Sequence, residues 1–247
     1  MSLLQARNLT VEVAGKPILK KLNLSVEESE TRILFGPNGS GKTSLLMALA
    51  GVPSYRLTEG EIIFQNQHIT QLPLNERVNL GVGLGFQQPP EVTGVKLKDL
   101  LKICAGDSPK DGLRPQAREL AEKLRLTPYL DRDVNVGFSG GERKRAEVLQ
   151  LLLLKPKLLL LDEPDSGVDL ESLKLIAETI TQYQAEEGAS ALIITHQGYI
   201  LEHIKAEKAC VLMEGGIFCE GDPDKIFQDI KEKGYRGCVE CRMRMKK

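Results

Sequence analysis

"GPNGSGKT", Gly36–Thr43, is the stretch of this 247-residue sequence that decides the fold. It fits the pattern G-x-x-x-x-G-K-[ST] and lies between a short apolar segment, "TRILF", and a segment with helical spacing, "KTSLLMALAG", that ends at Gly51. Glycines let a backbone curl so that successive N–H groups point at phosphate oxygens, and the N-terminal end of the following helix adds positive charge. A glycine turn that precedes a helix by chance is the alternative, and the strand–loop–helix context argues against it.

The same stretch supplies the side chains that a metal-bound triphosphate requires. Lys42 is expected to reach the β- and γ-phosphates, and the Thr43 hydroxyl is expected to ligate Mg²⁺. The sequence lacks the Asn-Lys-x-Asp segment of a guanine-specific protein, so ATP is the predicted nucleotide. The residues expected to bind it here are Gly36, Pro37, Asn38, Gly39, Ser40, Gly41, Lys42, Thr43 and Ser44.

Two later apolar segments end in side chains that suit phosphate chemistry. "LLLLDE" ends in Asp162, which can hold Mg²⁺ through water, and Glu163, which can orient or deprotonate the attacking water. The alternative is that both carboxylates only end a strand and cap the next helix. "IITH" ends in His196 at the carboxyl end of another buried strand, the edge where ligands collect in open α/β sheets, so His196 could contact the γ-phosphate.

Patterns around these segments predict an α/β fold. "LLQARNLTVEV" and "ILKKLNLSVEE" alternate as antiparallel strands do, whereas "KLLLLDEP" and "SALIITH" are apolar throughout, as strands buried in a parallel sheet are. "LESLKLIAETITQYQAEEG" predicts a crossover helix between the last two, and a hairpin is expected around Gly215 and Gly216. From Glu91 to Leu154 the spacing is helical. The predicted parts are an α/β core with an antiparallel β subdomain (1–91 and 155–234), a helical subdomain (92–154) and a tail (235–247).

Composition narrows the function classes. With 41% hydrophobic and 27% charged residues, the chain resembles ordinary soluble globular proteins. The formal net charge of −1 argues against a nucleic-acid binder. No apolar run approaches the roughly 20 residues of a membrane span, and the N-terminus lacks the pattern of a signal peptide. Five scattered cysteines suit reduced thiols, so a cytoplasmic location is expected.

A second glycine turn, "FSGGERKR", begins at Phe138. Ser139 and Glu142 have the spacing of a capping box at the start of a helix. Capping gives no reason for Gly140 and Gly141, which cost helix stability by up to about 1 kcal/mol each. Either the turn is a plain cap, or its backbone N–H groups are left open for a ligand.

Taken together, "GPNGSGKT", "FSGGE", "LLLLDEP", "DSGVD" and "ITH" resemble the ATPase domain of the ATP-binding cassette (ABC) family over nearly the whole chain. The resemblance implies a P-loop fold with a mixed sheet and an ATP-dependent head-to-tail homodimer that buries two ATP molecules. It implies that Ser139, Gly140 and Gly141 of one subunit close on the γ-phosphate held by the other, with Asp165–Asp169 crossing the interface. It also implies that Gln87 senses Mg²⁺ and the γ-phosphate, that Glu163 is the catalytic base and that His196 is the γ-phosphate contact. The expected catalytic residues are therefore Glu163, His196, Gln87 and Lys42. The expected metal ligands are Thr43, Gln87 and Asp162.

Two positions depart from that family's pattern. Glu142 stands where the family more often has Gln, which matters little if backbone N–H groups bind the ligand. "TVEVAGKPIL" lacks the aromatic residue that usually stacks on adenine, and Val11 or Val13 is expected in its place.

Within the family, "FQQPPEVTGV", "GFSGGERKR", "DEPDSGVD" and "THQGYILEHIKAEKACVLMEGG" resemble the SufC-type ATPases of iron–sulfur cluster assembly. The resemblance implies a complex with a SufB-like scaffold, alone or with SufD, and no insertion into a membrane. The ATP-binding subunit of a membrane transporter is the alternative, because most family members drive transporters. A DNA-associated ATPase is a third hypothesis, against which the near-neutral charge and the lack of coiled-coil heptads argue.

The tail "GCVECRMRMKK" places Cys238 and Cys241 in a C-x-x-C pair that the SufC resemblance does not cover. Two interpretations stay open: half of a zinc or iron–sulfur site completed by thiolates from elsewhere, or a solvated reduced tail.

Overall fold

The structure is a computed structural model that describes residues 1–108, 110–235 and 237. Its centre is a six-stranded sheet that is parallel from β11 to β6 and antiparallel at β12. Three of its strands are five-residue segments with every residue buried, which explains why their sequences are mostly apolar and do not alternate. In spatial order the strands are β12 (Gly216–Gly221), β11 (Lys208–Met213), β3 (Thr31–Phe35), β10 (Ser190–Ile194), β9 (Leu158–Asp162) and β6 (Val82–Gly85).

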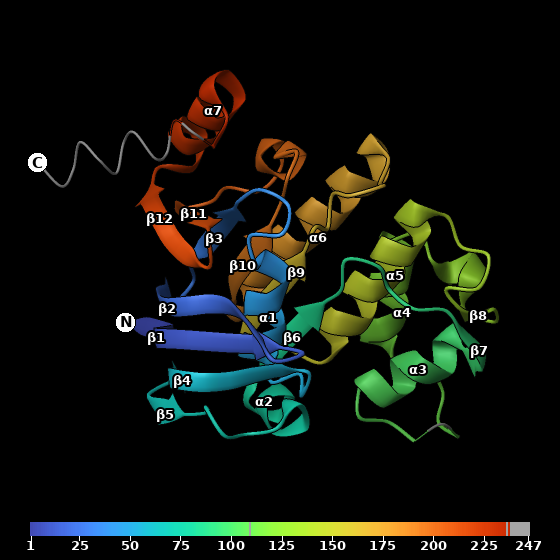
Figure 1. Ribbon diagram of the computed structural model, residues 1–247. Helices are drawn as coiled ribbons and strands as arrows, with labels where there is room; N and C mark the ends of the chain where they lie inside the picture. The colour runs from blue at the N-terminus through green and yellow to red at the C-terminus, as the bar shows by residue number, and fades with distance from the viewer. Residues whose placement is uncertain (109, 236, 238–247) are drawn as a thin grey trace, which may run out of the picture.

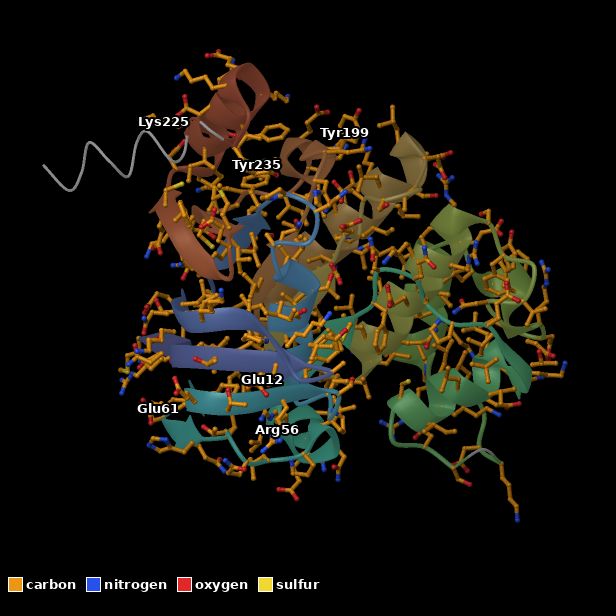
Figure 2. The ribbon with its side chains drawn as sticks, in the orientation of Figure 1. Glu12, Arg56, Glu61, Tyr199, Lys225 and Tyr235 are labelled. Atoms are coloured by element: carbon orange, nitrogen blue, oxygen red, sulfur yellow. The ribbon has the colours of Figure 1, made fainter. Side chains whose placement is uncertain are left out.

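A second, antiparallel sheet faces the first across a shared core. Its inner face is buried, and its outer face carries polar side chains such as Glu61, labelled in Figure 2. Helix α1 (Lys42–Ala50) lies between the two sheets and is buried on nearly all sides, as its apolar sequence requires. The strands of this sheet, in order, are β2 (Lys16–Glu27), β1 (Ser2–Val13), β4 (Tyr55–Phe64) and β5 (Gln67–His68).

The helical part lies beside the sheets, at the right of Figure 1. Its helices are α3 (Leu97–Cys104), α4 (Pro115–Lys123) and α5 (Gly140–Leu153), together with the 3₁₀ turn η1 (Thr127–Tyr129). The expectation of purely helical structure here is wrong in one respect, because β7 (Val92–Lys96) and β8 (Asp133–Val134) form a small two-stranded sheet. β7 is largely exposed on both faces, so its sequence lacks the alternation of apolar and polar residues that predicts a strand. The subdomain boundaries at 91 and 154 remain predictions.

The remaining elements connect these layers. The crossover helix α6 (Leu170–Glu187) joins β9 to β10, as predicted, and the expected hairpin around Gly215 and Gly216 joins β11 to β12. The sequence patterns missed α2 (Leu74–Leu80) and β6, which are short. The 3₁₀ turn η2 (Tyr199–Glu202) follows β10, and α7 (Pro223–Lys233) follows β12. Over the described ranges, no helix has the length and apolar character needed to cross a membrane.

Candidate active site

The phosphate loop, residues 36–43, follows β3 and runs into the first turn of α1, as the sequence predicts. Its glycines are required by space as well as by backbone conformation. A Cβ on Gly36 would lie 2.3 Å from the carbonyl oxygen of Leu212, and one on Gly41, whose φ is +103°, would lie 2.7 Å from the Leu19 side chain. The neighbouring strands therefore hold the loop tightly against the sheet.

Lys42 is already folded back over this loop. Its Nζ donates hydrogen bonds to the carbonyl oxygens of Gly36 at 2.8 Å and Pro37 at 3.0 Å. Burial lowers the pKa of Lys42, and the charges of Glu163 and Asp162 oppose that shift. The buried Lys42 ammonium therefore lies where it could neutralise the negative charge of phosphate oxygens bound at the loop.

Asp162 ends β9 beside the loop and is buried. Within the described part of the chain, neither of its carboxylate oxygens makes a hydrogen bond of regular geometry, and the Ser40 hydroxyl of the phosphate loop is likewise buried without one. Burial raises the pKa of Asp162, an effect that the Thr43 hydroxyl, Lys144 and Lys42 only partly offset. Buried polar atoms left in this state indicate a missing hydrogen-bonding or ionic partner.

Glu163 follows directly and is held from two sides. Its Oε2 accepts a hydrogen bond from Gln87 Nε2 at 2.8 Å, and its Oε1 lies 2.9 Å from His196 Nε2. The Glu163 backbone has φ +49°, a conformation that non-glycine residues adopt rarely and that recurs at functional sites. Three side chains from the ends of β6, β9 and β10 thus converge at the carboxyl edge of the sheet.

The loops after β9 and β10 are also tied together. Asp165 Oδ2 accepts a hydrogen bond from Thr195 Oγ1 at 2.6 Å, and Thr195 Oγ1 accepts one from the backbone N–H of Gly198 at 2.9 Å. Burial raises the pKa of Asp165, and the bond from Thr195 opposes that shift. The carboxylate-bearing segment after β9 therefore has a fixed position relative to His196.

Phosphate-loop residues, together with Gln87, Glu163 and His196, line a cavity of about 420 Å³. Six of the nine binding residues predicted in the phosphate loop and at Ser44 line it, and it includes one residue that the sequence did not suggest, Ile18 near the start of β2. Of the two residues expected in place of the adenine-stacking aromatic, Val11 is fully buried in the core between the sheets, and neither Val11 nor Val13 lines this cavity. The cavity is lined by Ile18, Asn38, Gly39, Gly41, Lys42, Thr43, Ser44, Gln87, Glu163 and His196.

The second glycine turn lies outside that cavity. Ser139 and Glu142 form the predicted capping box at the start of α5. The two glycines have a structural reason that the sequence did not reveal: a Cβ on Gly140 would lie 2.3 Å from the Gly167 carbonyl oxygen, and one on Gly141 would lie 2.6 Å from the Ser172 hydroxyl. Packing inside this chain is therefore enough to require them, and their presence alone does not demonstrate a ligand.

A separate cavity of about 590 Å³ lies between this turn and the loop after β6. Gln87 lines both cavities, and the second is otherwise formed by three stretches of the chain. Its lining residues are Gln87, Gln88, Pro89, Pro90, Glu91, Gly140, Arg143, Lys144, Ser166 and Gly167.

A residue far along the chain reaches the phosphate loop. The hydroxyl of Tyr235 accepts a hydrogen bond from the backbone N–H of Gly36 at 3.3 Å, and Figure 2 shows Tyr235 near α7. In the same region the ring of Phe227 on α7 stacks on Phe35 at 5.6 Å between centroids. No local pattern around Tyr235 predicts this contact, because it joins residues 199 positions apart.

The Cys238–Cys241 pair lies outside the described residues. Among the residues that are described, no group of three or more His, Cys, Asp or Glu side chains could hold a metal ion on its own. Both interpretations of the C-x-x-C pair therefore remain as the sequence left them.

Known proteins match this chain over nearly its full length. The family described as "ABC transporter" matches residues 19–166. The "Probable ATP-dependent transporter ycf16" of Cyanidium caldarium is 42% identical, covering 95% of this chain and 96% of the relative. A nucleotide-free ATP-binding cassette from an ABC transporter superposes with a TM-score of 0.80 at 25% identity, covering 97% of this chain and 99% of the other. The ADP conformation of the cassette MJ1267 gives a TM-score of 0.78 at 26% identity, with coverage of 97% and 98%.

Proposed function

Because the chain belongs to the ABC transporter family and is an ATPase of that family, we propose that it is the SufC-type ATPase of an iron–sulfur cluster assembly complex. The observation that carries this proposal is the convergence of separate segments on one cavity. Three of the four segments that carry the SufC resemblance, those beginning at Phe86, Gly137 and Asp162, contribute residues to the 590 Å³ cavity. Segments that are distant in the sequence would resemble SufC at one cavity if that cavity binds the same kind of partner as in SufC.

We propose that hydrolysis takes place in the 420 Å³ cavity. The γ-phosphate would lie near Lys42 and His196, and Glu163 would accept a proton from the attacking water. Glu163 Oε2 accepts one hydrogen bond, from Gln87, and Oε1 lies 2.9 Å from His196 Nε2, so both oxygens have lone-pair capacity for a water. Gln87 and His196 fix the carboxylate, so the base need not reorganise during the reaction.

Mg²⁺ fits the donors at this site. Asp162, Thr43 and Gln87 offer the hard oxygen ligands that Mg²⁺ prefers, and the buried oxygens of Asp162, which make no regular hydrogen bond within the described residues, are the specific sign of its place. When bound, the ion would neutralise charge on the β- and γ-phosphates. Asp162 lies at the end of a strand paired within the central sheet, so the position of this strand would determine where the ion is bound.

The site is proposed to be completed by a second copy of the chain. The Ser139 side of the second glycine turn is exposed, and the N-terminus of α5 carries the positive end of a 14-residue helix. This turn does not line the phosphate-loop cavity of its own chain, so an N–H donation to a γ-phosphate from Gly140 or Ser139 is proposed to act in trans.

A SufB-like scaffold, alone or with SufD, is proposed to dock at the 590 Å³ cavity. Exposed apolar surface at Phe86 and Val92 borders the loop that lines it, and Arg143 and Glu91 add charges 3.7 Å apart. A partner seated there would contact the loop that carries Gln87. ATP-driven closure of two copies could then be passed to the scaffold.

Affinity purification under anaerobic conditions, with partner identification by mass spectrometry, tests the assignment. We expect a scaffold protein without membrane spans to co-purify with the wild-type chain, and Arg143→Glu to lose it while still binding ATP. The matched control is Arg56→Glu, an exposed charge reversal on the antiparallel sheet (Figure 2). Recovery of a membrane permease instead would establish the alternative, a transporter subunit, which the word "transporter" in the name of the Cyanidium caldarium relative favours.

A further inference from the structure

Two side chains of α5 bind the backbone of Phe86, the residue immediately before Gln87. Glu147 Oε1 accepts a hydrogen bond from the Phe86 N–H at 2.5 Å, and Lys144 Nζ donates one to the Phe86 carbonyl oxygen. Lys144 and Glu147 also pair with each other, Nζ to Oε2, at 3.3 Å. Both polar groups of one peptide segment are thus held by one pair of charged side chains.

Lys144 of the same pair also binds the backbone next to Glu163, the hydrogen-bond partner of Gln87. Lys144 Nζ donates to the carbonyl oxygen of Asp162 at 3.4 Å, and Asp162 immediately precedes Glu163. The 2.8 Å hydrogen bond from Gln87 to Glu163 therefore lies between two backbone positions that α5 holds.

Side-chain packing does not explain why the backbone at Phe86 is fixed. Phe86 is 41% exposed, so its ring provides little anchorage. The preceding residue is Gly85, where a Cβ would lie 3.7 Å from the Glu147 carboxyl carbon and 3.1 Å from Leu161, so the strand end is closely fitted to this carboxylate. Burying an ion pair on α5 carries a desolvation penalty that surface residues would avoid. Its bonds to Phe86 and Asp162 are what offset that penalty.

We propose that Glu147 is a positioning residue for ATP hydrolysis, which holds the Phe86 backbone so that Gln87 meets Glu163. The inference rests on the proposed roles of Gln87 and Glu163. It links the start of α5, where the second glycine turn lies, to the geometry of the catalytic base through one helix.

Steady-state hydrolysis of Mg-ATP by the full chain tests the proposal. Glu147→Ala is expected to lower kcat about tenfold and to change KM by less than about twofold, because the phosphate loop is untouched and only the reacting geometry loosens. Glu147→Gln keeps an acceptor for the Phe86 N–H and is expected to recover most of the rate. Val148→Ala, a buried neighbour on α5, is the control for loss of stability alone and should leave kcat within about twofold. If Glu147→Ala does not fold, Glu147→Asp, whose shorter side chain reaches less far toward Phe86, carries the same comparison.

A double-mutant cycle with Gln87→Ala separates this inference from the proposed function. If Glu147 acts through Gln87, its replacement should slow the Gln87→Ala variant by less than about twofold. A full tenfold loss in that background, or a Glu147→Ala enzyme with wild-type kcat, would overturn the positioning role and leave the role of Gln87 intact. A Gln87→Ala variant with wild-type kcat would overturn both.

Discussion

Replacing Asp162 by Asn is expected to stabilise the nucleotide-free protein while impairing its activity. The carboxylate is buried at the end of a central strand, and within the described chain both of its oxygens lack a hydrogen bond of regular geometry. Its pKa is raised overall, so burial outweighs the attraction of Lys42 and Lys144, and the ionised form is disfavoured by folding. Asparagine keeps the shape and removes the charge.

The magnitude follows from the cost of unsatisfied buried acceptors. One such group costs about 1–3 kcal/mol of folding free energy, and the asparagine amide retains part of that cost. We therefore expect the variant to be more stable to unfolding than wild type by about 2 kcal/mol. For a domain of this size, 1 kcal/mol corresponds to roughly 2–4 °C in Tm. The variant should therefore melt about 4–8 °C above wild type.

Calorimetry in EDTA without nucleotide measures this difference directly. Asp131→Asn is the matched control, because Asp131 is a surface carboxylate with a 78% exposed side chain and its loss should change stability by no more than about 0.5 kcal/mol. Adding Mg-ATP should raise the Tm of wild type more than that of Asp162→Asn, since the variant has lost the proposed metal ligand. An Asp162→Asn protein that melts below wild type without nucleotide would show that the carboxylate is already satisfied in the folded chain, and the reasoning would fail.

Four further outcomes are expected. Lys42→Ala should abolish ATP binding or hydrolysis because the β/γ-phosphates lose their counter-charge; full turnover in an ATPase assay would discredit the site. Glu163→Gln should bind ATP but hydrolyse it slowly and accumulate an ATP-bound dimer in size-exclusion chromatography, and a wild-type rate would show that Glu163 is not the base. Tyr235→Phe removes the acceptor for the Gly36 N–H, worth about 0.5–1.5 kcal/mol, so KM for ATP should rise a few-fold with kcat unchanged; an unaltered KM would make the contact incidental. Burial raises the pKa of Asp165, so its ionised form increasingly costs stability as pH rises through the folded pKa; the Tm of Asp165→Asn relative to wild type should climb from about pH 4 to pH 7, and a constant difference would contradict this.

The sequence by itself determined the local elements of this protein. "TRILFGPNGSGKT" specifies a buried strand, a glycine loop and a helix start through nearest-neighbour conformational preferences. The apolar runs before Asp162 and His196 specify buried strands that end at one edge, and the capping box at Ser139 specifies where α5 begins. These features depend on residues within a few positions of each other, so they can be read without knowing the rest of the chain.

Tertiary structure decided which of these pieces meet, and what each is for. Gln87 joins Glu163 across 76 positions, and Tyr235 joins Gly36 across 199, so no local pattern contains either contact. The reason for Gly140 and Gly141 became visible only when α5 packed against the loop after β9, where a side chain has no room. The Lys144–Glu147 charge pair on α5 is buried beside the loop after β6, where it binds the backbone of Phe86. Contacts of this kind are fixed by shape and burial between distant segments, and those arise only when the whole chain is folded.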